Sequence, residues 1–282
     1  MDAILLCMKK SGIRFFSKIR FPNTEVVRFH AKKNFMGLLR SRRSEYDNVL
    51  VMAHGGNDAI LTTTRDLHRP FVRYIGRDEV DAFENDFVFA VSCLTANEFG
   101  GKCIERGSIA YLGYQVEIGF LFSANPSSES CVPNSVITSI NTLIKHAFIE
   151  SLSKAYEDFL QKPISVKLLR LRFAFEFEKR LSLLLEMTPK EVHEKYGVKF
   201  NDRHYAAYVT NLILKTIENL NEILPKLVCV GDENYISSTF IKFRKQEGQS
   251  GTEILQELES NPSFVDLRHE EYKSYLRKLA IS

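Results

Sequence analysis

The chain has 282 residues and a nearly balanced charge, with 38 basic and 35 acidic side chains and a formal net charge of +3. A composition of 44% hydrophobic and 26% charged residues excludes a largely disordered chain. The length suits one large domain or two modest ones. Basic clusters lie at 40–43 and at Lys242, Arg244 and Lys245, and neither is interleaved with exposed aromatic residues in a way that suggests a nucleic-acid groove, so we expect solvated faces and no nucleic-acid partner.

The five cysteines are scattered and form no CxxC pair, which argues against a structural zinc site. Cys7, Cys103 and Cys229 lie in apolar sequence, as reduced and buried thiols do. The N-terminal apolar run is too short for a signal peptide, and no stretch approaches the roughly 18 apolar residues that a membrane span needs. We therefore expect a cytoplasmic protein without a metal, a cofactor or a membrane contact.

Short apolar runs rich in Val, Ile and Phe predict buried strands in the first 125 residues, at 3–8, 25–29, 48–53, 86–92 and 108–114. Helical patterns are found at 34–43 and 97–106. This alternation predicts an α/β layer fold with a mostly parallel sheet flanked by helices. Between residues 59 and 84 we expect an edge strand at 71–75 and a helical turn at 77–83.

The character of the chain changes at 123–135, a polar segment with two prolines and five serines that predicts a loop. Helices are expected beyond it, at 135–160, 164–186, 188–197 and 202–224, and the tail from residue 246 is charged and weakly helical. We therefore divide the chain into an α/β domain, 1–125, and a mostly helical region, 126–282. The strand-like run 227–231 is a candidate to return to the first sheet.

Two reactive side chains follow predicted strands. His54 comes directly after 48–53 and precedes Gly55 and Gly56, and Cys93 comes directly after 86–92. Open α/β sheets place their ligand crevices at the carboxyl ends of parallel strands. If these two strands are neighbours, the imidazole and the thiol project from the same edge of the sheet.

The flanking residues favour a reactive cysteine. Thr95 to Glu98 match the capping-box pattern, which predicts a helix that begins just past Cys93 and whose positive end favours a thiolate. The His54 imidazole would activate the sulfur further. The backbone N–H groups of Gly55 and Cys93 could stabilise a tetrahedral oxyanion, each donor contributing about 3 kcal/mol.

The runs "VLVMAHGG" and "FVFAVSCLTANEFGG" carry a resemblance to the caspase-like (clan CD) cysteine peptidases, and "RGSIAYLGY" is similar to the strand that follows in bacterial CHAT proteases. The resemblance covers residues 1–125. It implies that His54 is the general base and acid, Cys93 the nucleophile and Gly55 an oxyanion donor. It also implies a substrate cleft along 112–119, where we expect Gly56, Tyr114 and Gln115 to contact the substrate.

The resemblance implies a cysteine endopeptidase that cleaves a protein substrate through a thioester, with 126–282 as a regulatory region for a small-molecule signal or a partner protein. Compact bacterial relatives act in antiviral defence or cell death. Caspases carry Gln-Ala-Cys-Arg/Gln/Gly-Gly with the histidine about 50 residues upstream. Here the run is Val91 to Thr95 and the separation is 39 residues, so no preference for Asp is implied.

Other interpretations remain open at this level. His54 with its glycines could be a strand-to-turn junction, and Cys93 a small buried hydrophobe. Asp58 either orients His54 or lies in a surface turn. An esterase loop is excluded because the chain has no Gly-x-Ser-x-Gly elbow. His193 lacks a second zinc-binding histidine, and His204 suits an ordinary polar contact. The alternative function is a catalytically inactive caspase-fold module that binds a small molecule or a protein partner.

Overall fold

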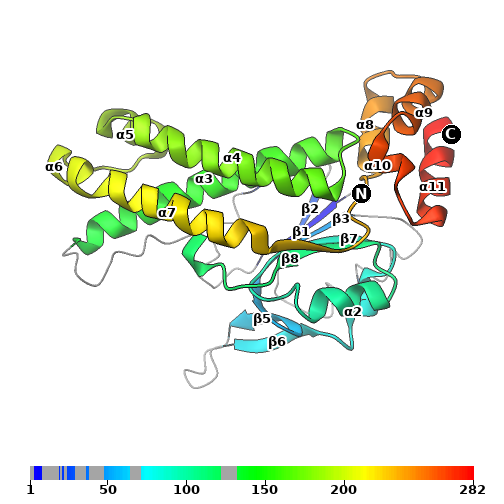
Figure 1. Ribbon diagram of the computed structural model, residues 1–282, viewed down its shortest axis with the longest axis horizontal. Helices are drawn as coiled ribbons and strands as arrows, with labels where there is room; N and C mark the ends of the chain where they lie inside the picture. The colour runs from blue at the N-terminus through cyan, green and yellow to red at the C-terminus, as the bar shows by residue number, and fades with distance from the viewer. Residues whose placement is uncertain are drawn as a thin grey trace. The chain divides into compact units, whose positions relative to one another are not determined.

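A computed structural model describes residues 3–7, 24–28, 48–63, 71–121 and 132–282, together with positions 19, 21, 36 and 37 (Figure 1). Of the helix expected at 34–43, only residues 36 and 37 are described, and they are helical. Most of the polar segment expected to form a loop, residues 122–131, lies outside the described residues.

The chain forms two compact units, and both are discontinuous in sequence. The first, called the sheet unit here, comprises 1–116, 156–170 and 227–282, and the second, the helical unit, comprises 117–155 and 171–226. This division differs from the single boundary predicted after residue 125.

The sheet unit contains a six-stranded sheet in the order β2–β1–β3–β7–β8–β9. All neighbouring strands are parallel except β9, which runs antiparallel to β8 at the edge. The predicted mostly parallel sheet and the returning last strand are thus confirmed. The strands are β1 (Ala3–Cys7), β2 (Thr24–Arg28), β3 (Asn48–Met52), β7 (Phe87–Val91), β8 (Ala110–Tyr114) and β9 (Leu227–Gly231).

The central strands are buried along their whole length, as continuous apolar runs in a covered parallel sheet require. Every residue of β3, β7 and β8 is buried. The strand order reverses between β1 and β3, because β2 lies on one side of β1 and β3 on the other. Open α/β sheets bind ligands outside such a reversal, so the carboxyl end of β3 is a favoured place for a site.

A second, antiparallel sheet of three strands follows β3 directly. It consists of β4 (His54–Gly56), β5 (Ala59–Thr63) and β6 (Phe71–Gly76), with a two-residue turn at 57–58 between β4 and β5 (Figure 1, in cyan). The 3₁₀ helix Val80–Phe83 comes next. The sequence predicted β6 and the helical turn, but not the hairpin of β4 and β5.

Helix α2 (Phe99–Glu105) packs against β8 through an aromatic contact. The rings of Phe99 and Tyr111 meet edge to face, with their centroids 6.0 Å apart. Gly100 makes room for this contact, since a methyl group at that position would lie 2.7 Å from the Tyr111 ring. Such edge-to-face pairs stabilise a fold beyond the area that they bury.

Two long helices continue the chain, α3 (Asn134–Gln161) and α4 (Val166–Glu186). In the helical unit they pack through Phe148 of α3, whose ring meets Phe173 at 5.2 Å and Phe177 at 5.3 Å, both edge to face. The helical interpretation of 164–186 is confirmed, because the predicted stripe of Val166, Leu169, Phe173, Phe177, Leu181 and Leu184 is fully buried. Phe175 and Leu171, which gave the run its strand-like alternation, are exposed.

The remaining helices of this unit are short. Helix α5 (Pro189–Tyr196) lies within the range predicted for a helix, 188–197. It begins at a complete capping box of Thr188 and Glu191 and ends at Gly197 with φ +70°. The helix expected at 202–224 is divided into α6 (Asp202–His204), a π turn (Tyr205–Val209), α7 (Thr210–Ile223) and a 3₁₀ turn (Leu224–Lys226). A 3₁₀ turn (Gly119–Leu121) lies between β8 and α3 in the sequence. None of the described helices has the length and apolar character of a membrane span.

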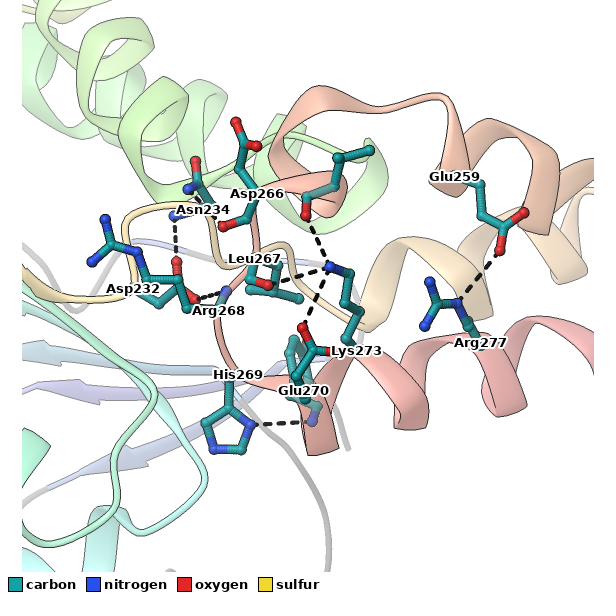
Figure 2. A network of polar contacts seen from close by, with 12 residues as sticks. Asp232, Asn234, Glu259, Asp266, Leu267, Arg268, His269, Glu270, Lys273 and Arg277 are labelled. Atoms are coloured by element: carbon teal, nitrogen blue, oxygen red, sulfur yellow. Dashed lines mark hydrogen bonds and ion pairs between the residues drawn. The ribbon is translucent and has the colours of Figure 1, made fainter.

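The C-terminal tail is more ordered than its composition suggested, and it forms helices that Figure 1 shows in orange and red. A polar network fixes it to the end of β9 (Figure 2). The Asp232 carboxylate accepts hydrogen bonds from the backbone N–H groups of Asn234 at 3.0 Å and Arg268 at 2.6 Å. The Lys273 ammonium donates to the Val265 carbonyl at 2.8 Å. The helices are α8 (Thr239–Gln246), α9 (Gly251–Glu259), α10 (Pro262–Val265) and α11 (Glu270–Ile281).

A buried amide joins the start of β3 to this C-terminal region. The Asn48 side chain, which is fully buried, donates to Ser237 Oγ at 2.7 Å and to Thr239 Oγ1 at 3.3 Å, and accepts from the Tyr235 hydroxyl at 3.1 Å. Because its donor and acceptor atoms all have partners, the amide costs little to bury and fixes the strand in register.

Candidate functional site

The strands that precede His54 and Cys93 are direct neighbours. β3 and β7 pair in parallel, and Met52 lies opposite Val91. The pairing continues one residue further, because the Ala53 N–H donates to the Val91 carbonyl at 3.4 Å and the Ser92 hydroxyl to the Ala53 carbonyl at 2.9 Å. His54 and Cys93 therefore leave the sheet side by side, and both are partly exposed. The expected adjacency of the two strands is confirmed.

His54 opens strand β4 and lies opposite Leu61 of β5. The residue follows the end of β3 and is partly buried. This burial lowers the pKa of the His54 imidazole below its ordinary value of 6.5, because desolvation disfavours the cation. At neutral pH the ring is therefore uncharged and able to accept a proton.

Gly55 lies directly against the backbone of the cysteine. A methyl group on its Cα would lie 2.2 Å from the Cys93 carbonyl oxygen and 3.0 Å from the Cys93 backbone nitrogen. Such distances are far below van der Waals contact, so the close approach of these two segments of the backbone requires a residue without a side chain at position 55. The glycine after the histidine thus joins the two halves of the site.

The segment after Cys93 is a series of turns, and the predicted capping box at Thr95 to Glu98 is wrong. Helix α2 begins only at Phe99, and the residue before it, Glu98, makes no side-chain cap. The hydroxyl of Thr95 instead donates to the Ser92 carbonyl at 3.4 Å. The helix expected to begin just past Cys93 therefore begins at Phe99, and the thiolate stabilisation inferred from its predicted start is withdrawn.

The first N–H groups of α2 are already satisfied by the hairpin turn. The Asn57 carbonyl accepts from the N–H of Glu98 at 3.1 Å and of Phe99 at 2.8 Å, and the Asn57 side-chain oxygen accepts from the Asn97 amide at 3.0 Å. Sequence reasoning missed this role, because only the fold brings the β4–β5 turn to the start of α2. Asn57 locks the histidine-bearing hairpin to the cysteine-bearing loop.

The loop is also fixed to the end of β8. The Leu94 N–H donates to the Val116 carbonyl at 3.2 Å, and the Ala96 N–H to the Tyr114 carbonyl at 3.1 Å. Leu94 has φ +61°, a left-handed conformation that costs a residue with a side chain about 1–2 kcal/mol. These bonds hold the residue after Cys93 in that conformation and set the direction in which the cysteine points.

The other residues expected at the site differ in their surroundings. Gly56 is half-buried, and Gln115 is exposed, with its carbonyl accepting from Asn97 at 3.2 Å. Tyr114 is fully buried, so its side chain is not accessible to a substrate in this structure. Asp58 forms an ion pair with Arg73, which favours the surface-turn interpretation of this residue.

Two further cysteines are chemically quiet. Burial raises the pKa of Cys103 well above the ordinary value, and burial with the carboxylates of Glu233 and Asp232 raises the pKa of Cys229 to about 12. Within the described part of the chain, no cluster of three or more His, Cys, Asp or Glu residues could hold a metal ion. Cys93 is therefore the candidate nucleophile that the geometry singles out from these three thiols.

His193 and His204 of the helical unit belong to no described group of three or more potential metal ligands. His193 is exposed on α5. His204 Nδ1 lies 3.1 Å from the Asn201 amide nitrogen, the ordinary polar contact that the sequence suggested.

No protein-family model and no curated protein sequence matches this chain.

Proposed function

We propose that this protein is a caspase-like cysteine endopeptidase that cleaves a protein substrate with a Cys93–His54 dyad. The observation that carries the proposal is the parallel pairing of β3 and β7, which brings an imidazole and a thiol out of the sheet in adjacent positions. The structural alternative, a buried cysteine beside an unrelated turn, does not account for the partial exposure of both side chains.

The chemistry follows from the state of the two groups. The neutral His54 ring takes the proton of the Cys93 thiol as the sulfur attacks the scissile carbonyl carbon. The backbone N–H groups of Gly55 and Cys93 are the proposed donors to the resulting oxyanion. His54 then returns the proton to the amine as the C–N bond breaks, and the thioester remains. Water, deprotonated by His54, attacks the thioester and releases the acid and the thiol.

Regulation by the region 126–282 is part of the proposal. In the helical unit, a surface pocket of about 250 Å³ is lined by Ser135, Val136, Ser139, Lys199, Phe200, Asn201 and His204. Its hydroxyl, amide, ammonium and imidazole groups suit a small polar signal, which would be the activator. A role in antiviral defence is proposed from the family resemblance alone, and a cytoplasmic location from the scattered cysteines and the short N-terminal apolar run.

The test is covalent labelling with a panel of peptide acyloxymethyl ketones that differ in the residue at the cleavage position. We expect one adduct per chain, located on Cys93 by peptide mapping, and labelling that falls at least a hundredfold in His54→Asn and disappears in Cys93→Ala. Cys229→Ala is the matched control and should label like the wild type, because its thiol has a pKa of about 12.

The alternative function is a caspase-fold module that binds a signal or a partner without cutting. It is favoured if folded wild-type protein is labelled no faster than His54→Asn across the whole panel, with and without cell extract as a source of activator. Hydrolysis of an unfolded protein substrate that survives in Cys93→Ala would also contradict the peptidase proposal.

A further inference from the structure

Tyr114, the last residue of β8, has a buried hydroxyl that the packing does not explain. Its side chain is fully buried, and among the described residues its hydroxyl oxygen has no hydrogen-bond partner. Leaving a buried hydroxyl unsatisfied costs about 1–3 kcal/mol, and phenylalanine would fill the same space without that cost. The Tyr111 hydroxyl on the same strand shares this property, and what distinguishes Tyr114 is its hydrogen bond to the cysteine-bearing loop.

The register of the sheet places Tyr114 beside the end of the strand that precedes the cysteine, and in this structure its hydroxyl makes no hydrogen bond to the Cys93 sulfur. The last pair between β7 and β8 is Ala90 with Gly113, so Tyr114 stands next to Val91 and on the same face of the sheet. Cys93 follows Val91 by two residues. The Ala96 N–H, bound to the Tyr114 carbonyl at 3.1 Å, folds the cysteine-bearing loop back over the end of β8.

We propose that the Tyr114 hydroxyl is the internal hydrogen-bond donor to the Cys93 sulfur when that sulfur becomes a thiolate. The phenol keeps its proton throughout, and the bond lowers the free energy of the charged sulfur. This donor is proposed in place of a helix that begins just past Cys93, because α2 begins only at Phe99. A role of this hydrogen bond in peptide cleavage rests on the proposed function, whereas its effect on the pKa of the Cys93 thiol does not.

The electrostatics of the pair are consistent with this geometry. Burial, and in second place the nearby Cys93 sulfur, raise the pKa of Tyr114 far above its ordinary value of 10. The phenol therefore remains protonated at every pH at which the protein would act, and it can only donate to an anion. A hydrogen bond to the charged form of a group lowers that group's pKa.

Tyr111 supplies a matched control on the same strand. It is also fully buried, but strand alternation places it on the opposite face, where it meets Phe99 of α2. The thiol that raises its pKa, after burial, is that of Cys103 and not Cys93. Tyr111→Phe thus removes a buried phenolic hydroxyl from β8 without touching the proposed donor.

The experiment measures the rate of Cys93 alkylation by iodoacetamide from pH 5 to pH 10, resolved by peptide mass spectrometry. In Tyr114→Phe we expect the profile to move to higher pH by about one unit, the effect of one hydrogen bond to a charged group, and the rate below the midpoint to fall about tenfold. Tyr111→Phe should keep the wild-type profile. Identical profiles for the two variants would overturn the inference.

A second measurement covers the case in which a variant fails to fold. In wild-type protein with ¹³C-labelled tyrosine rings, the Tyr114 resonance should shift with the ionisation of Cys93, and this shift should vanish in Cys93→Ala. No such difference would overturn the inference. Neither readout needs turnover. If the Tyr114→Phe profile shifts but no peptide ketone labels the protein, the hydrogen bond from Tyr114 is supported and the peptidase proposal is contradicted.

Discussion

The close contact between Gly55 and Cys93 gives the sharpest prediction, for the substitution Gly55→Ala. The added methyl carbon would lie 2.2 Å from the Cys93 carbonyl oxygen and 2.7 Å from Thr95 Cγ2, whereas ordinary contact begins at 3.4 Å. The backbone at Gly55 or at Cys93 must therefore move by roughly 1 Å, and the close packing of protein interiors opposes such a movement. Overpacking of this kind costs about 1–3 kcal/mol, and we expect the upper end because the obstacle is backbone.

The matched control is Gly56→Ala, where the nearest atom to the new methyl group would be Leu61 Cδ1 at an ordinary 3.6 Å. At about 2–4 °C per kcal/mol for a domain of this size, scanning calorimetry should find Gly55→Ala roughly 5–10 °C below wild type. Gly56→Ala should stay within about 2 °C. A 1 Å displacement can reduce a reaction rate about a hundredfold, so labelling of Cys93 should fall with it. Equal melting temperatures and equal labelling for the two variants would refute the reasoning.

Three further predictions concern stability. Phe173→Ala should destabilise the protein by about 3–5 kcal/mol in urea unfolding, whereas Phe175→Ala, on the exposed face of the same helix, should change it by less than about 0.5 kcal/mol; equal losses would contradict the assigned faces. Asn48→Ala should cost about 2–4 kcal/mol, because it leaves the Tyr235 hydroxyl buried without its acceptor; a loss below 1 kcal/mol would argue against that network. The pKa of His54 is lowered in the fold, so the contribution of its neutral ring to the free energy of unfolding is complete above pH 6.5 and is lost as the pH falls through the folded-state pKa. Acid should therefore destabilise the wild type more than His54→Gln. Parallel curves of stability against pH for the two proteins would show that the ring is not desolvated.

The sheet could be predicted from the sequence because most of its strands contain continuous apolar runs. A run such as 87–91 is buried on both faces, so no periodicity competes with its assignment. Helix α4 could be predicted because its apolar residues, among them Phe173 and Phe177, keep helical spacing over more than four turns. The strand-like alternation in the same segment lasts only a few residues. In both cases the local pattern and the tertiary burial agree.

The candidate site could be predicted only in part. The positions of His54 and Cys93 followed from strand ends, but the hairpin after His54 has strands of three and five residues, too short for a clear pattern. The capping box at Thr95 failed because tertiary hydrogen bonds from Asn57 satisfy the start of α2 in place of a local side chain. Tyr114 was assigned to a substrate cleft by the family resemblance, whereas every residue of β8 is buried.

The measurement that tests the central claim most directly is a cross-link between the two strand ends. Neighbouring strands lie about 4.8 Å apart, and disulfides join Cα atoms about 4.4–6.8 Å apart. The account predicts that His54→Cys, under mild oxidation, forms an intramolecular disulfide between position 54 and Cys93, detectable by peptide mapping, while Asp58→Cys forms none with Cys93. A folded His54→Cys variant that stays fully reduced at both positions, or that links position 54 to another cysteine, would contradict the shared edge on which the dyad depends.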